Sequence, residues 1–261
     1  MTVTLAGVTI VAPDLDRVIE AYATFLGYQA GPVGVAGPAL AAQWNAPDAA
    51  TARVVELRPA SGEARFIRLV EGQPAPDYRP LAHPGWAAAE IVVQAVDELA
   101  ETLANSPFRI VGPPAVLDFD FTDKIKAMQV IGPCGEALYL TQIDGEVPGF
   151  ALPQAMSAVG QLFIMVLATR SLPESMAALV ELGGVGGPEI EARIEVLSDV
   201  FGLPRDHRHK LATVALTQES YVEVDQLPDG ALDRPPSSIG LASGIAAVTL
   251  LRDGSTVELL L

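Results

Sequence analysis

Residues 5–28 read LAGVTIVAPDLDRVIEAYATFLGY, and this stretch predicts a strand that leads directly into a helix. Its opening run of β-branched residues is typical of a buried strand. Asp14 stands where a helix N-cap is expected, and Gly27 stands just past the last helical turn. Apolar residues then recur at spacings of three and four, which places them on one helix face. These residues are Val18, Ile19, Tyr22, Phe25 and Leu26.

The same pattern recurs further along the chain. Residues 87–110 and 158–184 each begin with an apolar run and continue into an amphipathic stretch. Asp97 and Ser171 are the expected N-caps of these two helices. A second kind of segment, which enters from a turn and reads as a strand, closes each unit. The closing segments are residues 62–72, 135–145, 218–228 and 254–261.

Each unit therefore reads as a strand, a helix and about three further strands. Stretches rich in Pro and Gly at residues 72–84 and 145–153 separate the units. The fourth unit is abbreviated, because residues 243–251 lead through a predicted Asp253-Gly254 hairpin turn into the closing strand. We expect an α+β fold in which βαβββ modules pair into curved mixed sheets that form clefts, with helices on the convex faces.

The order of the units along the chain predicts two domains. The first, residues 1–147, would pair the module at 1–75 with the module at 85–145. The second, residues 154–261, would be an incomplete copy of the first. Because the fourth module is short, an exposed sheet edge there could be covered by another copy of the chain, which predicts a possible homodimer.

The composition limits the classes of partner. The net charge of −16 disfavours nucleic acid and anionic membrane surfaces, both of which attract basic proteins. The longest apolar runs are too short for a membrane span. A single cysteine, Cys134, and an N-terminus without a basic segment favour the cytoplasm. We expect a small-molecule partner, no nucleic acid and no membrane.

The repeated units resemble the glyoxalase / bleomycin-resistance / extradiol-dioxygenase superfamily, also called vicinal oxygen chelate. The resemblance is carried by TIVAPDLDRVIEAYATFLGY, EIVVQAVDELAETL, GPCGEALYLTQ and SYVEVDQLP, and it covers nearly the whole chain. It implies paired βαβββ modules around a cleft. It also implies a divalent metal, where one is present, on His of opening strands and Glu of closing strands.

We can read the corresponding positions in this chain. In the first unit they fall on Gly7 and Arg68, and in the second on Glu90 and Tyr139, with Thr141 as the other register for Tyr139. The third unit offers Gln161 and Glu223, and the fourth offers Glu258 on its closing strand.

None of these positions is a histidine, which departs from metal-binding members of the superfamily. A divalent site needs about three protein ligands in fixed geometry. We therefore expect no cofactor, with a divalent metal held by oxygen ligands as the alternative.

Three side chains are expected to share the first cleft. Arg68 would bind a ligand, and Glu90 or Tyr139 would act as acid or base. The structural alternative is that Arg68 and Glu90 form a buried ion pair. Gln161 and Glu223 are expected to contact a ligand in the second cleft, where Glu223 and Glu258 could also form a carboxylate pair or face solvent.

His207 and His209 alternate along a predicted strand within the only strongly basic cluster of the chain, residues 205–210. They could bind an anionic ligand or contact another subunit, or they could belong to a solvated loop.

The sequence thus favours a protein that binds a small, partly hydrophobic or aromatic molecule without the superfamily's metal. Whether it is an enzyme is left open. One alternative is a metal-dependent lyase, isomerase or ring-cleaving dioxygenase that uses Glu223, Glu258 and a histidine. The other is a non-catalytic scaffold whose clefts are filled by side chains.

Overall fold

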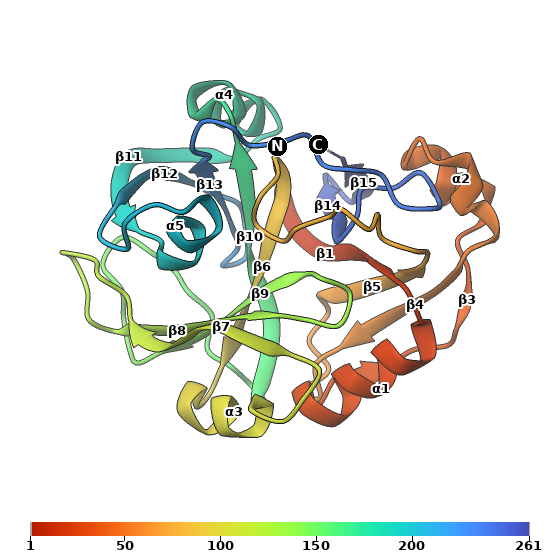
Figure 1. Ribbon diagram of the computed structural model, residues 1–261, viewed down its shortest axis with the longest axis horizontal. Helices are drawn as coiled ribbons and strands as arrows, with labels where there is room; N and C mark the ends of the chain where they lie inside the picture. The colour runs from red at the N-terminus through yellow and green to blue at the C-terminus, as the bar shows by residue number, and fades with distance from the viewer. Residues whose placement is uncertain (1, 261) are drawn as a thin grey trace.

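The computed structural model describes residues 2–260, and Figure 1 shows two curled mixed sheets with helices around them. The first module contains β1 (Val3–Ala12), α1 (Leu15–Leu26), β2 (Gln29–Ala30), β3 (Gly34–Val35), α2 (Gly37–Gln43), the 3-10 helix η1 (Pro47–Thr51), β4 (Arg53–Arg58) and β5 (Phe66–Glu71). The second contains β6 (Gly85–Val93), α3 (Val96–Leu103), β7 (Arg109–Val116), β8 (Ile125–Ile131) and β9 (Ala137–Ile143). The third contains β10 (Val159–Thr169), α4 (Leu172–Glu181), β11 (Val185–Arg193), α5 (Glu195–Phe201), β12 (Arg208–Ala215) and β13 (Tyr221–Gln226), and the fourth only β14 (Ile245–Arg252) and β15 (Ser255–Leu259).

Most of the helix caps and turns expected from the sequence are present in the structure. The Asp14 side chain accepts a hydrogen bond from the backbone N–H of Arg17, and Gly27 ends α1 in the left-handed region at φ 69°. Asp253 and Gly254 both have positive φ and join β14 to β15 in a tight hairpin. The prediction for α3 is wrong in detail, because the helix starts after Ala95 and Asp97 lies inside its first turn.

The pairing of modules differs from the pairing expected from chain order. Sheet A has the order β15-β14-β1-β5-β4-β2, with β3 beside β4, so it joins the first module to the fourth. Sheet B has the order β11-β12-β13-β10-β6-β9-β8-β7, so it joins the second module to the third. The expected pairing of modules one and two is therefore wrong. The physical reason is that β1 pairs antiparallel with β14, the opening strand of the fourth module, and β6 pairs antiparallel with β10, the opening strand of the third.

The main core lies between the outer helices and both sheets. Along β1, Val8 and Ile10 face this core, whereas Val11 faces the opposite side of sheet A, as the alternation of a strand requires. Figure 1 places α1, α3 and α4 at the periphery, as expected for helices on convex faces. The sequence did not predict two further helices, α2 and α5, and these lie on the opposite faces of the sheets. α2 leads into Trp44, which packs on the other face of sheet A, and α5 packs on the other face of sheet B.

Hydrogen bonds of Trp86 and Arg234 are among the contacts that connect the two sheets. Trp86 on β6 donates its indole N–H to the carbonyl of Leu259 at 2.9 Å. Arg234 donates to the carbonyls of Trp86 and Ile245 at 2.7 and 2.8 Å, so one guanidinium bridges β6 and β14. The last module is thus bound both to β1 and to the second module.

We expect a fragment of residues 1–147 to lack a cooperative thermal unfolding transition. Without residues 245–259, β1 loses its antiparallel neighbour, and without β10 the second module loses its partner, so both present unpaired edges. Differential scanning calorimetry and amide NMR dispersion measure this, with the full chain as control. A fragment that unfolds cooperatively would show that the first two modules form an independent domain after all.

Candidate functional site

Arg68 occupies the middle of the concave face of sheet A. Its guanidinium donates to Glu258 Oε1 at 3.0 Å and reaches Glu56 Oε1 at 3.4 Å. Its strand neighbour is Thr9, whose hydroxyl lies 3.2 Å away, so the opening position next to Arg68 is Thr9 and the prediction of Gly7 is wrong by two residues. Gly7 instead leaves room for Phe66, because a Cβ there would lie 2.5 Å from the ring.

The partners of Arg68 are themselves held in place. The Glu258 side chain is fully buried and also accepts hydrogen bonds from Trp44 Nε1 at 3.0 Å and from the Thr249 hydroxyl at 2.9 Å. The guanidinium carbon of Arg68 lies 4.8 Å from the centroid of the Phe66 ring, a cation–π distance. The expected ion pair of Arg68 with Glu90 does not exist, because the two residues lie in different sheets.

A wide recess lies beside Arg68. It has a volume of about 700 Å³ and is lined among others by Thr4, Arg58, Arg65 and Gln161. Gln161 therefore belongs to this recess and is separated from Glu223, with which the sequence grouped it. Arg65 is buried and donates to the carbonyls of Leu162 and Gln218, which connects the first module to the third.

The concave face of sheet B carries the second cavity, which we call the sheet B cleft. It has a volume of about 210 Å³, and its floor contains Glu90 on β6, Tyr139 on β9 and Glu223 on β13. Glu90 and Tyr139 are direct neighbours across β6 and β9, as the sequence predicted for the second module. Apolar walls come from β7 and the segment after it, through Val111, Leu117 and Phe119.

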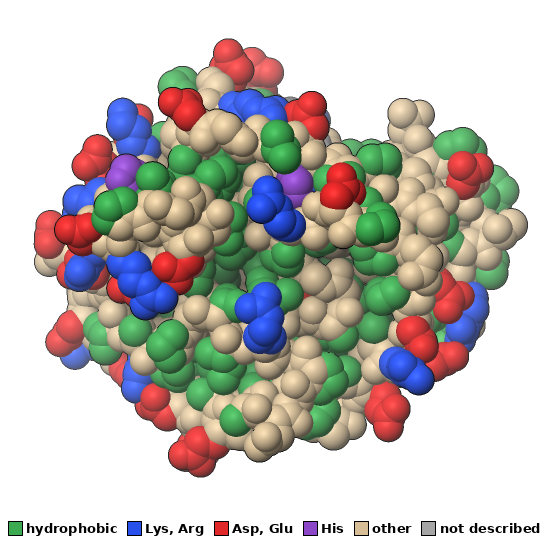
Figure 2. Space-filling model, in the orientation of Figure 1, with side chains coloured by type: hydrophobic (Ala, Val, Ile, Leu, Met, Phe, Trp, Pro, Cys, Tyr) green, Lys and Arg blue, Asp and Glu red, His purple; other side chains and the backbone are tan. Residues whose placement is uncertain are grey.

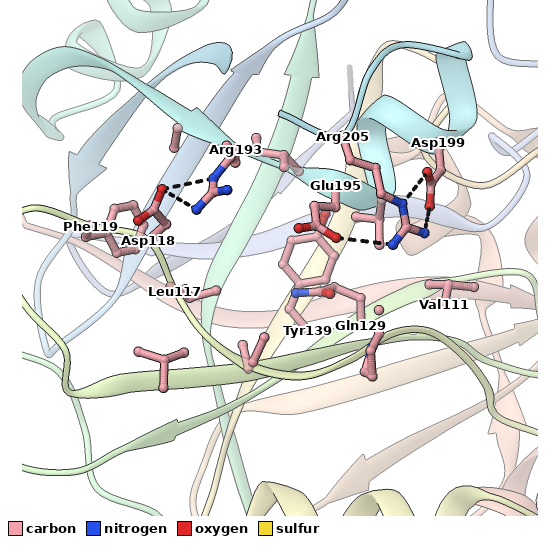
Figure 3. Close-up of a pocket in the computed structure, with 18 of the residues that line it drawn as sticks. Val111, Leu117, Asp118, Phe119, Gln129, Tyr139, Arg193, Glu195, Asp199 and Arg205 are labelled. Atoms are coloured by element: carbon pink, nitrogen blue, oxygen red, sulfur yellow. Dashed lines mark hydrogen bonds and ion pairs between the residues drawn. The ribbon is translucent and has the colours of Figure 1, made fainter. Parts of the chain in front are cut away.

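Figure 3 shows how the mouth of this cleft is built. Tyr139 points into it beside Gln129, below Glu195 and Arg205 from the α5 region, while Arg193 and Asp118 lie to one side. α5 covers the face, because Val196 and Leu197 pack in one cluster with Ala88, Tyr139 and Val166. In the orientation of Figure 1, Figure 2 shows hydrophobic side chains across the middle of the molecule with a few Lys or Arg side chains among them, and most of the acidic side chains toward the periphery.

Three carboxyl groups gather under this cleft. Glu90 and Asp225 are buried, and Glu223 and Asp225 share one face of β13 because they lie two residues apart. The Thr141 hydroxyl donates to Glu90 Oε1 at 2.6 Å. Within residues 2–260, no Lys, Arg or His forms an ion pair with any of the three.

Burial without a cation changes how these groups ionise. Desolvation, together with the charge of Glu223, raises the pKa of Glu90 to about 8. Desolvation also raises the pKa of Glu223, and it raises that of Asp225 together with the charges of Glu223 and Glu90. The pKa of Tyr139 is raised by burial and by the same carboxylates, which keeps the phenol protonated. At neutral pH the cleft therefore offers both a proton donor and an acceptor.

The predicted metal alternative does not fit the observed positions. Glu223 and Glu258, which would have shared it, lie in different sheets. In sheet A the guanidinium of Arg68 already holds Glu258, and a metal there would face that cation. Across residues 2–260 no group of three or more His, Cys, Asp or Glu side chains has an arrangement that could hold a metal ion.

The histidine pair lies outside both cavities. His207 is exposed and His209 is buried, with their rings 4.7 Å apart. His209 Nε2 lies 2.8 Å from the Ser198 hydroxyl on α5, so this histidine fastens α5 to β12. Burial and the charge of His207 lower the pKa of His209, so its neutral form makes this contact near pH 7.

Sequence reasoning missed the residues that α5 brings to the cleft. Glu195, Val196 and Asp199 all line it. The stretch IEVLSDVFG did carry a helix signal, because Val196, Leu197, Val200 and Phe201 lie on one helical face and Gly202 follows at φ 65°.

None of the helices within residues 2–260 has the length and the apolar character that a membrane span requires.

Replacing the cation of sheet A should destabilise the fold unless its partner changes too. We expect Arg68→Met to lower the free energy of unfolding by about 3–5 kcal/mol, because Glu258 is left buried and unpaired. The double variant Arg68→Met/Glu258→Gln should recover part of that loss. Urea denaturation of both single variants and the double variant measures the coupling, and strictly additive losses would contradict the buried ion pair.

Glu90 should make stability depend on pH in a defined direction. Its pKa is about 8 in the folded chain against an ordinary value of 4.5, so its contribution is complete below about pH 4.5 and is lost as pH rises through about 8. Glu90→Gln should therefore raise stability at about pH 9 more than at about pH 5. Thermal unfolding at both pH values measures the difference, and an equal effect at both would show that Glu90 titrates normally.

Comparisons with known proteins agree with this architecture. No protein-family model and no curated protein sequence matches the chain. Among solved structures, glyoxalase I from Zea mays aligns with a TM-score of 0.61 and 14% identity, covering 95% of this chain and 74% of that one. A single-site variant of the same maize enzyme aligns with a TM-score of 0.62 and 15% identity, over 95% of this chain and 75% of that one. The chain therefore has the fold of the glyoxalase, or vicinal oxygen chelate, superfamily.

Proposed function

We propose that this chain binds a small, partly hydrophobic molecule in the sheet B cleft and does so without the superfamily's metal. The single observation that carries the proposal is the convergence of Glu90, Tyr139 and Glu223 on one cavity with apolar walls. Cavities that combine apolar walls with a few polar groups are the usual form of small-molecule sites. Carboxyl groups whose pKa values are shifted by burial are also concentrated at functional sites.

The geometry supports proton transfer as the chemistry of this site. Glu90, with a pKa of about 8, holds its proton at pH 7 and could donate it, while Glu223, partly ionised, could accept one. Tyr139 lies beside Glu90 and supplies a hydroxyl that stays protonated. If the chain is an enzyme, an isomerase or lyase that moves a proton within its substrate would use these groups.

The recess beside Arg68 has weaker support as a binding site. The charge of Arg68 is already met by Glu258 and Glu56, so a ligand carboxylate would have to compete with two acids of the chain. The cytoplasmic location, the homodimer and the lack of nucleic-acid partners stay predictions from the sequence.

A screen of small aromatic and aliphatic compounds should find ligands that perturb one region of the amide NMR spectrum. We expect the shifts to lie at Val111, Phe119, Gln129 and Tyr139, because these residues line the cleft. Tyr139→Phe should weaken binding about tenfold through the loss of one hydroxyl contact. Glu56→Gln, in sheet A, is the matched control and should leave the affinity unchanged.

Two results of this screen would count against the proposal. Shifts confined to Arg65 and Phe66 would move the site to the recess of sheet A. The absence of any ligand would favour the alternative of a non-catalytic scaffold.

A further inference from the structure

The charges around the sheet B cleft are unbalanced toward the negative. Its lining contains five acids, Glu90, Asp118, Glu195, Asp199 and Glu223, against two bases, Arg193 and Arg205. This surplus of three acidic side chains counts ionisable groups rather than charges, because Glu90 keeps its proton at pH 7 and Glu223 is partly ionised. The chain as a whole has a net charge of −16. An anionic ligand would meet repulsion both at long range and inside the cavity.

The two arginines do not offset the carboxyl groups of the floor, because each is already paired. Arg193 lies 2.7 Å from Asp118, and Arg205 lies 2.7 Å from Asp199 and 3.4 Å from Glu195. Figure 3 shows both pairs at the mouth of the cleft, on either side of Tyr139. The floor carboxyls Glu90, Glu223 and Asp225 are left without a cation.

A second observation points to a missing partner. Asp225 is 4% exposed, and its Oδ1 has no hydrogen-bond partner among the described residues. A buried carboxyl oxygen without a partner costs free energy, so such an atom in a folded protein calls for an explanation. Asp225 is not among the residues that line the cleft, but it interacts electrostatically with Glu223 and Glu90, which do line it, so a positive charge beside these two would also favour the ionised form of Asp225.

We infer that the ligand of the sheet B cleft is an organic cation, such as an amine or amidine attached to an apolar body, whose charged group contacts Glu90 and Glu223. This inference rests on the proposed function and specifies the class of its ligand. An ammonium or amidinium group supplies several N–H donors and a positive charge, which are the two things that this floor lacks.

The cavity suits the rest of such a molecule. Val111, Leu117, Phe119 and Val196 provide apolar walls, and the ring of Phe119 can also face a cation. A volume of about 210 Å³ corresponds to about seven waters at ~30 Å³ each, which is enough for a small aromatic body. A bare divalent ion would leave these walls unused, and the carboxylates lack an arrangement that could hold one.

Binding of a cation should displace a proton. Glu90 keeps its proton at pH 7, and the groups that face it are Tyr139 and Thr141 on β9 and Glu223 and Asp225 on β13. The charged groups at the mouth of the cleft are the ion pairs described above: Arg193 on β11 with Asp118 after β7, and Arg205 after α5 with Glu195 and Asp199 on α5. A cation next to Glu90 favours its ionised form, so the proton leaves as the ligand enters.

Three probes of one shape separate charge from size. Benzamidine is a cation, benzamide is its neutral counterpart and benzoate is its anion. We expect benzamidine to bind at least tenfold more tightly than the other two in isothermal titration calorimetry. Its affinity should rise with pH between about 6 and 8, approaching tenfold per pH unit, because one proton is released for each ligand bound. Titrations in buffers with different ionisation enthalpies count that proton.

Substitutions in the floor of the cleft test whether benzamidine binds there. Glu90→Gln should weaken benzamidine binding at least tenfold at about pH 8 and flatten its pH dependence, while Glu56→Gln should change neither. Gln mimics the protonated glutamate and can still accept from Thr141, so the variant should fold, and circular dichroism checks this. Glu223→Gln provides a second, independent test of the same floor.

The outcomes distinguish the inference from the proposed function. Equal or tighter binding of benzamide or benzoate would overturn the cationic ligand while leaving the cleft as a binding site. Displacement of benzamidine by low concentrations of Mn²⁺ or Mg²⁺ would mean that the cation is a metal, which also overturns it. No binding of millimolar benzamidine contradicts the inference, and if the general screen is also empty the proposed function fails with it.

Discussion

A carboxyl group that is buried in a protein must either meet a cation or keep its proton, and the two concave faces of this chain meet that requirement differently. In sheet A, Arg68 supplies the cation to Glu258, whose side chain is fully buried and contacted by three donors. In sheet B, no side chain supplies a cation to Glu90, Glu223 and Asp225, so burial raises their pKa values. In sheet A a side chain of the protein already supplies the positive charge that the buried Glu258 requires. In sheet B a ligand can supply the positive charge that Glu90, Glu223 and Asp225 lack.

This difference arises on equivalent frameworks. In each sheet, the opening strands of two modules are antiparallel neighbours. The closing strands β5, β9 and β13 run parallel to their own opening strands, whereas β15 of the abbreviated fourth module runs antiparallel to β14. Arg68 and Tyr139 stand at corresponding places on β5 and β9, opposite Thr9 and Glu90. The two faces therefore differ in charge at this place, because Arg68 is a cation that pairs with Glu258, whereas Tyr139 is a phenol that leaves Glu90 without a cation. The fold alone, shared with a maize enzyme at 14% identity, does not determine which of the two results.

Local features of the fold could be predicted from the sequence, whereas the pairing of modules could not. The spacing of Val18, Tyr22 and Leu26 and the cap at Asp14 determine α1 through contacts between near neighbours in the chain. The choice of β14 over β6 as the partner of β1 depends on edges that form only in the assembled sheets, and no local signal carries it. The neighbours Glu90 and Tyr139 were predicted because they belong to one module. Glu223 lies near Glu90 and Tyr139 because the second module pairs with the third, and Arg68 lies apart from them because the first module pairs with the fourth.

The order of the modules has a consequence for synthesis on the ribosome. Strand β1 is synthesised before every strand of sheet B, whereas the hairpin of β14 and β15 that covers one of its edges is synthesised after all of them. Sheet B can close once β13 has emerged, while β1 must wait with an open edge of mostly apolar residues. During that interval the nascent chain is exposed to wrong pairing with other chains, and a chaperone that shields Val3–Ala12 would protect it.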